Sequence, residues 1–375
     1  MDALAGADPI VLTRGTAVRP LPPLDVDAAA LGRVFVGGVG AGGTGEGRGT
    51  IVDVLRRHGT LGLVVLHRGR LAYEWYPPGG DRGARHPCYS VTKSFTGTLA
   101  ALAVHDGVLD RAARVGDLVR ALARSGFGDA TVGQVADMTV SLAYDEDYAD
   151  AAAGESAGDR FGFGDYVAAI VPRGAGPAGG LRGLLARIGR GQRPHGEAFA
   201  YATPATDVLG WLLEEARGRS YADLLLDGIW RHVGAQHDAA VGRAADGTPL
   251  VGAGLATTTR DLARAGALVA ERRHVPAAIV ESIRARGDPG AFRRGGRYAY
   301  LAGYAYRDQW WLAGGAHRPL TAWGIHGQLL WIDPDAELVV ACHSAGHEPS
   351  DRRRDLDHDA LCRALTAQAS AWATP

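Results

Sequence analysis

The sequence predicts an α+β fold in which one antiparallel sheet is built from both ends of the chain and flanked by helices, with a helical lobe inserted between them. Strand-like patterns occur at 61–76 and again at 328–343, whereas helical spacing and loops dominate 106–245. We therefore expect a flexible N-terminal segment over 1–48, an α/β lobe formed by 49–105 with 246–375, and a helical lobe over 106–245.

The N-terminal segment is rich in Ala, Gly and Pro, and its stretch "VGGVGAGGTGEG" is typical of a flexible connection. Gly38, Gly40 and Gly43 match a GxGxxG pattern, but "TGEG" follows where a helix should begin, so a dinucleotide site is not predicted. A phosphate-binding Walker loop is excluded because it needs a lysine, and the only lysine of the chain lies elsewhere.

The first strands are "LGLVVLHRG" and "RLAYEWY", which we expect to form a hairpin that turns at His67–Gly69. Residues 90–105 follow as a predicted buried helix, because Phe95, Leu99 and Leu102 fall on one stripe.

Further elements follow in the second half. "ATDVLGWLLEEARG" has helical spacing and is closed by Gly218, and "TTTRDLARAGALV" begins with Thr258 and Asp261 at the spacing of a capping box. "QLLWIDPDAELVVACH" predicts two strands around an Asp-Pro-Asp turn, and a last helix is expected from about Leu356 to Ala369.

The composition excludes several classes of partner. The formal net charge is -1, so the chain lacks the broad basic field that nucleic acid or an anionic membrane requires. No apolar run approaches the ~18 residues of a membrane span, and "MDALAGADPI" lacks the pattern of a secretory signal. Three well-separated cysteines, Cys88, Cys342 and Cys362, suit reduced thiols. We expect a cytoplasmic protein.

Lys93 is the only lysine in a chain that has 40 Lys plus Arg residues. Ser90 lies three residues earlier at the predicted start of a helix, so the two side chains share one face and the helix N-terminus favours a developing oxyanion. A serine hydroxyl needs a base, and a buried amine with a lowered pKa supplies one, whereas a guanidinium stays charged. The pattern predicts Ser90 as nucleophile and Lys93 as its base.

Two alternatives use other side chains. Cys88 is near Ser90, but no cysteine-protease signature surrounds it. His343, His347 and His358 with Glu348 suggest a metal site, although no HExxH motif accompanies them and a polar C-terminal loop is more often solvated. We therefore expect neither a metal nor another cofactor.

An S-x-x-K motif is the signature of serine β-lactamases and penicillin-binding proteins. "CYSVTKSFTG" resembles the first motif of this superfamily. "VADMTVSLAYDEDYAD", "FAYATPATDVLGWLLEEARGRSY", "GLATTTRDLARAG", "YRDQWW" and "GIHGQLLWIDP" resemble, in order, segments of its 6-aminohexanoate-dimer hydrolase and class C-like esterase branch. The resemblance runs from about residue 60 to 345 and implies a β-lactamase/transpeptidase-like fold with the active site between two lobes.

The resemblance also implies roles for individual residues. Tyr201 is expected to carry a proton to the leaving group, and the Ser90 and Ile325 amides to form the oxyanion hole. Thr203 stands where β-lactamases usually have Asn, and we expect it to cap the helix begun by Pro204.

The resemblance places further residues at the substrate. Because adjacent strand residues point to opposite faces, at most one of the two tryptophans is expected to line the pocket, and His326 is equally consistent with a structural role. The candidate substrate-binding residues are Tyr144, Trp310, Trp311, Gly324 and His326.

The function that follows is hydrolysis of a small amide or ester through an acyl group on Ser90. One alternative is an ATP-independent transacylase of secondary metabolism that passes the acyl group to an amine or alcohol. The other is a sensor that binds acyl compounds without turnover. A small-molecule substrate and an amine acceptor are the partners considered.

Overall fold

A computed structural model describes residues 8–37, 49–149, 160–171, 179–272 and 274–372. The glycine-rich stretch from Gly38 to Gly47, with the glycines of the GxGxxG pattern, lies outside the described residues.

The central sheet has seven antiparallel strands in the order β3-β2-β13-β12-β11-β10-β9. The strands are β2 Thr60–His67, β3 Arg70–Trp75, β9 Ala305–Arg307, β10 Trp310–Leu312, β11 Leu320–Gly324, β12 Gln328–Asp333 and β13 Leu338–Ser344. β2 pairs directly with β13, with His67 opposite Leu338, so the two ends of the chain meet in the middle of the sheet. The predicted α+β fold, with one antiparallel sheet drawn from both chain ends, is confirmed.

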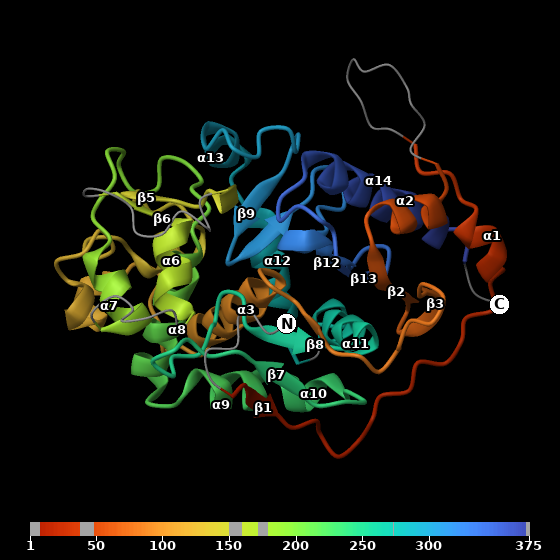
Figure 1. Cartoon of the computed structure of the whole chain (residues 1–375), viewed down its shortest axis with the longest axis horizontal. Coiled ribbons are helices and arrows are strands. Elements are labelled where there is room, and N and C mark those ends of the chain that lie inside the picture. The colour runs from red at the N-terminus through yellow and green to blue at the C-terminus, as the bar shows by residue number, and fades with distance from the viewer. Residues whose placement is uncertain (1–7, 38–48, 150–159, 172–178, 273, 373–375) are drawn as a thin grey trace.

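Both faces of this sheet are covered by helices (Figure 1). Along β13, Val339 and Ala341 join the hydrophobic core that contains α3 (Val91–His105) and α11 (Thr259–Ala270). Val340 and Cys342 point the other way, into the core shared with α2 (Ile51–Arg57) and α14 (Arg352–Ala369). Because neither face meets water, the central strands have continuous apolar sequences instead of alternating ones.

Local signals in the sequence place the ends of several elements. The β2–β3 hairpin turns at Arg68 and Gly69, which both have positive φ. Thr258 caps α11 by accepting a hydrogen bond from the Asp261 amide, and α8 (Thr203–Arg217) ends at Gly218 in the left-handed conformation. These predicted boundaries are confirmed.

A second sheet was not foreseen. It has four strands in the order β1-β7-β8-β4, formed by Ile10–Leu12, Ala239–Val241, Leu255–Thr257 and His86–Pro87. The N-terminal segment therefore differs from the flexible stretch that was expected, because its β1 is hydrogen-bonded to β7 and a short helix α1 spans Ala28–Gly32. Strand β4 leads directly to Ser90.

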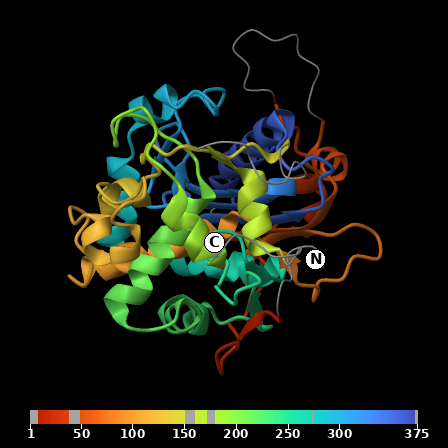
Figure 2. The ribbon, with the colours of Figure 1, turned by 60° about the vertical axis from the view of Figure 1, so that its left-hand side comes forward.

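The middle of the chain forms a mainly helical part beside the sheet, which Figure 2 brings forward in yellow and green. Its elements are α4 Val115–Leu118, η2 Arg120–Leu122, α5 Val132–Ala136, β5 Tyr144–Asp145, β6 Phe161–Gly162, α6 Phe163–Ile170, α7 Gly180–Arg187, α8, α9 Tyr221–Leu225, η4 Leu226–Trp230 and α10 Arg231–Val233. The remaining elements are α12 Ala277–Arg286, α13 Pro289–Arg294 and η5 Ile325–Gly327. Over the described ranges, no helix combines the length and apolar character that a membrane crossing requires.

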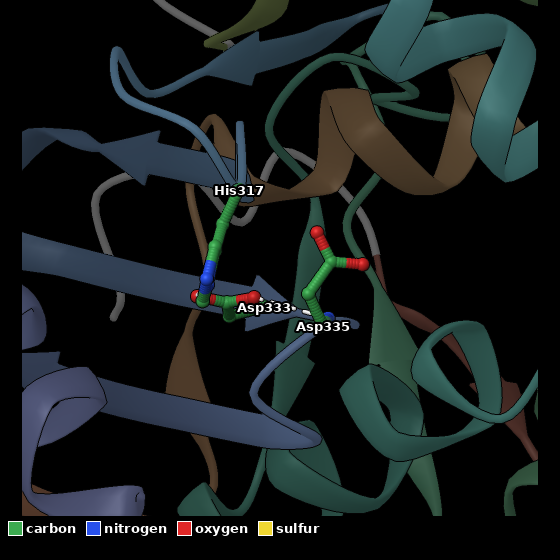
Figure 3. Close-up of side chains that lie close together, drawn as sticks. All are labelled: His317, Asp333 and Asp335. Carbon is green, nitrogen blue, oxygen red and sulfur yellow. Dashed lines mark hydrogen bonds and ion pairs between the residues drawn. The ribbon is translucent and has the colours of Figure 1, made fainter.

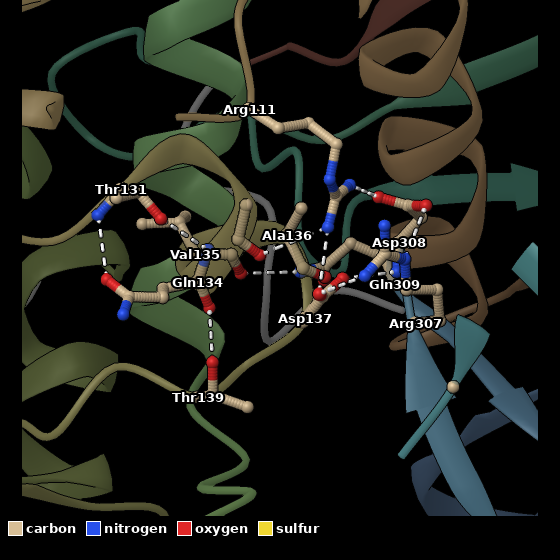
Figure 4. A network of polar contacts seen from close by, with 12 residues as sticks. Arg111, Thr131, Gln134, Val135, Ala136, Asp137, Thr139, Arg307, Asp308 and Gln309 are labelled. Atoms are coloured by element: carbon tan, nitrogen blue, oxygen red, sulfur yellow. Dashed lines mark hydrogen bonds and ion pairs between the residues drawn. The ribbon is translucent and has the colours of Figure 1, made fainter. Parts of the chain in front are cut away.

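A polar network joins the helical part to the sheet at the turn between β9 and β10 (Figure 4). Asp137 accepts hydrogen bonds from Arg111 at 2.8 Å and from Arg307 at 2.9 Å, and Gln309 donates to the Ala136 carbonyl at 3.0 Å. Ser94 of α3 donates to the Gln309 carbonyl at 2.7 Å. The network therefore fixes α3, which carries the candidate site, relative to both parts of the molecule.

Candidate active site

Ser90 and Lys93 lie at the N-terminal end of α3 and contact each other. Ser90 is the N-cap residue of the helix, and Lys93 Nζ lies 2.9 Å from Ser90 Oγ. The amine also donates to the Gly252 carbonyl oxygen at 2.8 Å. Because Lys93 is 1% exposed, its amine is held in one position inside the protein.

Burial sets the basicity of Lys93. It disfavours the ammonium form and lowers the pKa of Lys93 to about 8, although Glu146 and Asp207 act in the opposite direction. With this pKa about one molecule in ten carries a neutral amine at pH 7, against about one in 2,500 at the reference pKa of about 10.4. The site therefore holds a usable fraction of free base.

Tyr201 contacts both Ser90 and Lys93. Its ring centre lies 5.3 Å from Lys93 Nζ, and its phenol interacts with the Ser90 hydroxyl. Burial nevertheless raises the pKa of Tyr201 well above its ordinary value. The phenol is therefore neutral near pH 7, so it is suited to relaying a proton and not to acting as a standing tyrosinate base.

Ile325 lies in the same pocket as Ser90 because β11 ends in close contact with the segment before Ser90. A Cβ placed on Gly324 would lie only 2.7 Å from the Cys88 carbonyl oxygen, so only glycine permits this approach. Ser90, Gly324 and Ile325 line the same pocket. This is the arrangement that an oxyanion hole made of the Ser90 and Ile325 amides requires.

The pocket at Ser90 is strongly aromatic. Its lining residues are Ser90, Tyr148, Tyr201, Tyr298, Leu301, Trp311, Trp323, Gly324, Ile325, Pro349, Ser350, Arg354 and Asp355. Trp311 and Tyr298 lie edge to face with ring centres 4.8 Å apart. Flat aromatic walls of this kind suit a small organic substrate, and Arg354 and Asp355 add charged groups to the lining.

The family is decided by a comparison over most of the chain. The family model described as Beta-lactamase matches residues 48–364. The chain belongs to the beta-lactamase family. It is also 32% identical over 299 residues to the 6-aminohexanoate-dimer hydrolase of Paenarthrobacter ureafaciens, which covers 78% of this chain and 74% of that protein.

Solved structures of the beta-lactamase fold resemble the whole molecule. A putative 6-aminohexanoate-dimer hydrolase from Bacillus anthracis has a TM-score of 0.78 at 23% identity, covering 97% of this chain and 91% of that chain. EstCE1, described as a hydrolase with promiscuous acyltransferase activity, has a TM-score of 0.61 at 15% identity and covers 82% and 95%. Both likenesses concern the fold.

The two tryptophans of "YRDQWW" separate as strand geometry requires. Trp311 lines the pocket. Trp310 is fully buried on the opposite face, where its indole donates to the Thr98 hydroxyl of α3 at 3.2 Å. Trp310 is therefore part of the core and does not reach the pocket.

Tyr144 also lies away from the pocket. It is 7% exposed and belongs to the hydrophobic core that contains α3. Burial and the neighbouring Glu146 raise the pKa of its phenol. The pocket is lined instead by Tyr148, four residues later in the same "YDEDY" stretch. The resemblance indicated the stretch, but the choice between its two tyrosines depends on how the loop after β5 folds.

His326 contacts the loop that follows β13, beside the end of β11. Its Nδ1 lies 2.8 Å from the Gly346 carbonyl oxygen, and its ring lies 5.5 Å from that of Tyr89. Tyr89 and His326 both have positive φ, at 44° and 63°, and each adjoins a proposed oxyanion donor. His326 is not among the residues that line the pocket, so the geometry favours the structural alternative for it.

Thr203 does not cap α8 as was expected. It is the first residue of the helix, and both its amide, at 2.8 Å, and its hydroxyl donate hydrogen bonds to the Glu146 carboxylate. Glu146, which is 2% exposed, was missed at the sequence level because a lone Glu in an acidic loop looks solvated. Its two hydrogen bonds hold the carboxylate at the N-terminus of α8.

The alternative nucleophile and metal ligands are dispersed. Burial raises the pKa of Cys88 to about 12, so its thiol stays protonated. Burial lowers the pKa of His343 and of His358 to about 3 each, and His347 is exposed beside Glu348.

A different group, His317, Asp333 and Asp335, lies close together at one end of the sheet (Figure 3). Asp333 contacts His317 Nδ1 at 2.9 Å. Asp335 forms an ion pair with Arg284 and lies 3.6 Å from Arg272. Asp333 accepts hydrogen bonds from the Asp335 and Ala336 amides at 3.1 Å each, so both carboxylates already have partners. This cluster is a structural one.

Proposed function

We propose that the protein is an acyl-serine hydrolase that acts on a small amide or ester. The observation that carries this proposal is the 2.9 Å contact between Lys93 Nζ and Ser90 Oγ in a buried site where the amine has a lowered pKa. Two relatives, a 6-aminohexanoate-dimer hydrolase and a hydrolase with promiscuous acyltransferase activity, support chemistry at amide or ester bonds.

The reaction proceeds in two halves. Ser90 Oγ attacks the carbonyl carbon while its proton passes to Lys93, and the carbonyl oxygen becomes an oxyanion held by the Ser90 and Ile325 amides. As the C–N or C–O bond breaks, Tyr201 delivers a proton to the leaving group and is reprotonated from Lys93. Water then attacks the acyl carbon, gives up a proton to the same groups, and releases the acid and free Ser90.

Intact-mass spectrometry with an activated ester tests this proposal. The wild-type protein should gain the mass of the acyl group on Ser90 and release acid continuously, and Ser90→Ala should do neither. Turnover by Ser90→Ala would overturn the proposal. A stable adduct without turnover would assign the chain to the sensor class instead.

A second candidate is transfer of the acyl group to an amine. The aromatic walls formed by Tyr298, Trp311 and Trp323 favour it, because an organic acceptor packs against them better than water does. Supplying an ester donor with a panel of primary amines distinguishes the two. Free acid as the sole product at every amine concentration would remove this candidate.

A further inference from the structure

Two buried carboxylates lie near Lys93, and their surroundings differ. Glu146 accepts two hydrogen bonds from Thr203 at the N-terminus of α8. Asp207 lies one turn further along the same helix and is 5% exposed. Neither oxygen of Asp207 has a partner with the distance and angles of a full hydrogen bond. Of the two, only Glu146 is held by full hydrogen bonds.

Gly252 connects Asp207 to Lys93. Its carbonyl oxygen accepts from Lys93 Nζ at 2.8 Å, while its amide approaches the Asp207 carboxylate. A Cβ on Gly252 would lie 3.0 Å from Thr203 Cγ2 and 3.6 Å from Asp207 Oδ1, so this backbone packs tightly against α8. The carboxylate and the amine are thus held in fixed positions on either side of one residue, without a direct ion pair.

Glu146 also acts on Asp207, because its negative charge raises the pKa of the Asp207 carboxyl. Apart from Lys93 and Glu146, the groups that face Asp207 carry little net charge. Tyr144 of β5 and Tyr166 of α6 are buried phenols whose hydroxyls also lack a full hydrogen bond. Tyr221 of α9 is bonded to the Thr96 hydroxyl at 2.7 Å. Toward the surface, the ion pair between Arg182 and Glu214 shares a small crevice with Asp207.

Burial, partly offset by Lys93, raises the pKa of Asp207 to about 7, close to that of Lys93 itself. The two groups therefore titrate over one pH range and influence each other.

We propose that Asp207 is a positioning residue that raises the basicity of Lys93: its carboxylate stabilises the ammonium form across Gly252, so that the amine is a stronger base than burial alone would leave it. This inference rests on the proposed function only for the use of that basicity, which is to accept the proton of Ser90. When Ser90 gives up its proton, the new ammonium forms beside an existing negative charge. The same charge reduces the fraction of free amine before the reaction.

Direct titration of Lys93 tests the proposal without any substrate. Because Lys93 is the only lysine, protein labelled with lysine carrying ¹³C at Cε gives a single lysine side-chain signal that needs no assignment. Removing the negative charge in Asp207→Asn should move the midpoint of this signal to lower pH by about one unit. An unchanged or higher midpoint would overturn the proposal.

Two further variants support the titration. Asp359→Asn is the matched control, because Asp359 is a buried carboxylate on α14 that bonds Tyr304 and Arg363 away from the site, and its midpoint should equal that of wild type. Tyr166→Phe serves if Asp207→Asn does not fold. Loss of the phenol contact raises the pKa of Asp207, so the Lys93 midpoint should fall by a smaller amount; no shift in this variant would count against the proposal.

The kinetic consequence separates this proposal from the proposed function. In wild type, kcat/KM should rise with pH through the Lys93 pKa of about 8, because only the free amine accepts the Ser90 proton. In Asp207→Asn the rise should occur at lower pH while the plateau falls, since the amine is a weaker base. A lower plateau with an unmoved rise would overturn the proposal. A shifted NMR midpoint in a protein without activity would leave it standing and remove the proposed function.

Discussion

Lys93 remains a lysine in a chain that otherwise uses arginine for positive charge, and its buried position gives the physical reason. In Lys93→Arg the guanidinium keeps the charge but cannot accept a proton, so kcat/KM should fall by at least about 10²-fold. Lys93→Met, which adds no polar group to the core, should lose as much. Near-normal activity in the folded Arg variant, judged by circular dichroism, would mean that the site needs only a positive charge.

The contribution of Tyr201 to kcat/KM should be larger for a leaving group that must be protonated than for one that departs as an anion. With the neutral phenol removed in Tyr201→Phe, hydrolysis of an amide should fall by about 10²-fold or more, because an amine leaves only when protonated. A nitrophenyl ester, whose leaving group departs as the anion, should be affected less. The measurement is kcat/KM on a matched amide and ester that share one acyl group. Equal losses on both would contradict a relay to the leaving group.

Thr203 predicts poor recognition of β-lactams. Its hydroxyl, at the position of the usual Asn, is committed to Glu146 and is unavailable to orient a lactam amide. We expect no measurable turnover of a penicillin or a chromogenic cephalosporin under conditions where a simple ester is hydrolysed. Rapid lactam hydrolysis would contradict this.

At the scale of elements, the end of β11 positions the proposed oxyanion hole. In Gly324→Ala the added methyl group would lie 2.7 Å from the Cys88 carbonyl oxygen and push the strand away from Ser90. The expected result is a loss of about 10²-fold in kcat, the size seen when one oxyanion donor is lost, with about 1–3 kcal/mol of stability. Kinetics and thermal melting measure the two effects.

The control for this substitution is Gly37→Ala. No atom of the residues that the structure describes lies within 4 Å of a Cβ at Gly37, so neither kcat nor the melting temperature should change. A Gly324→Ala variant with kcat equal to that of the control would show that Ile325 needs no such close approach.

Elements with a strong local signal were predictable from the sequence. Gly218 and the Thr258 cap act within one turn of chain, so the boundaries of α8 and α11 follow from them. Strand β1 was missed because three residues carry no periodic signal and its order comes from pairing with β7, about 230 residues away.

In the candidate site, too, local contacts were predictable from the sequence and tertiary contacts were not. Ser90 and Lys93 are brought together by one turn of helix, which a four-residue motif determines. The choice of Tyr148 over Tyr144 depends instead on tertiary packing, and so does the contact of Glu146 with Thr203. No pattern within "YDEDY" shows which of its two tyrosines lines the pocket.

At the scale of the molecule, the sheet depends on the C-terminal helix. Leu361 and Leu365 of α14 share a core with Leu329 and Trp331 of β12. A chain that stops after Ser350 loses this cover, and each fully buried Leu is worth about 1.5–3 kcal/mol against a total stability of about 5–15 kcal/mol.

We therefore expect a chain that stops after Ser350 to be insoluble or to lack a cooperative thermal transition. A chain that stops after Ser370 keeps all of α14 and should melt close to the full-length protein. A cooperative melt of the shorter chain at the same temperature would show that the sheet is stable without its C-terminal cover.

The solitary buried lysine has a practical consequence for chemical labelling. The folded surface offers no lysine amine, because the only one is 1% exposed and bonded to Ser90 and Gly252. A reagent that reacts only with amines, and so spares Ser90, therefore finds the terminal amino group alone until the core opens. A second label on a molecule would report exposure of Lys93. The rate at which it appears would therefore measure how often the core opens at α3.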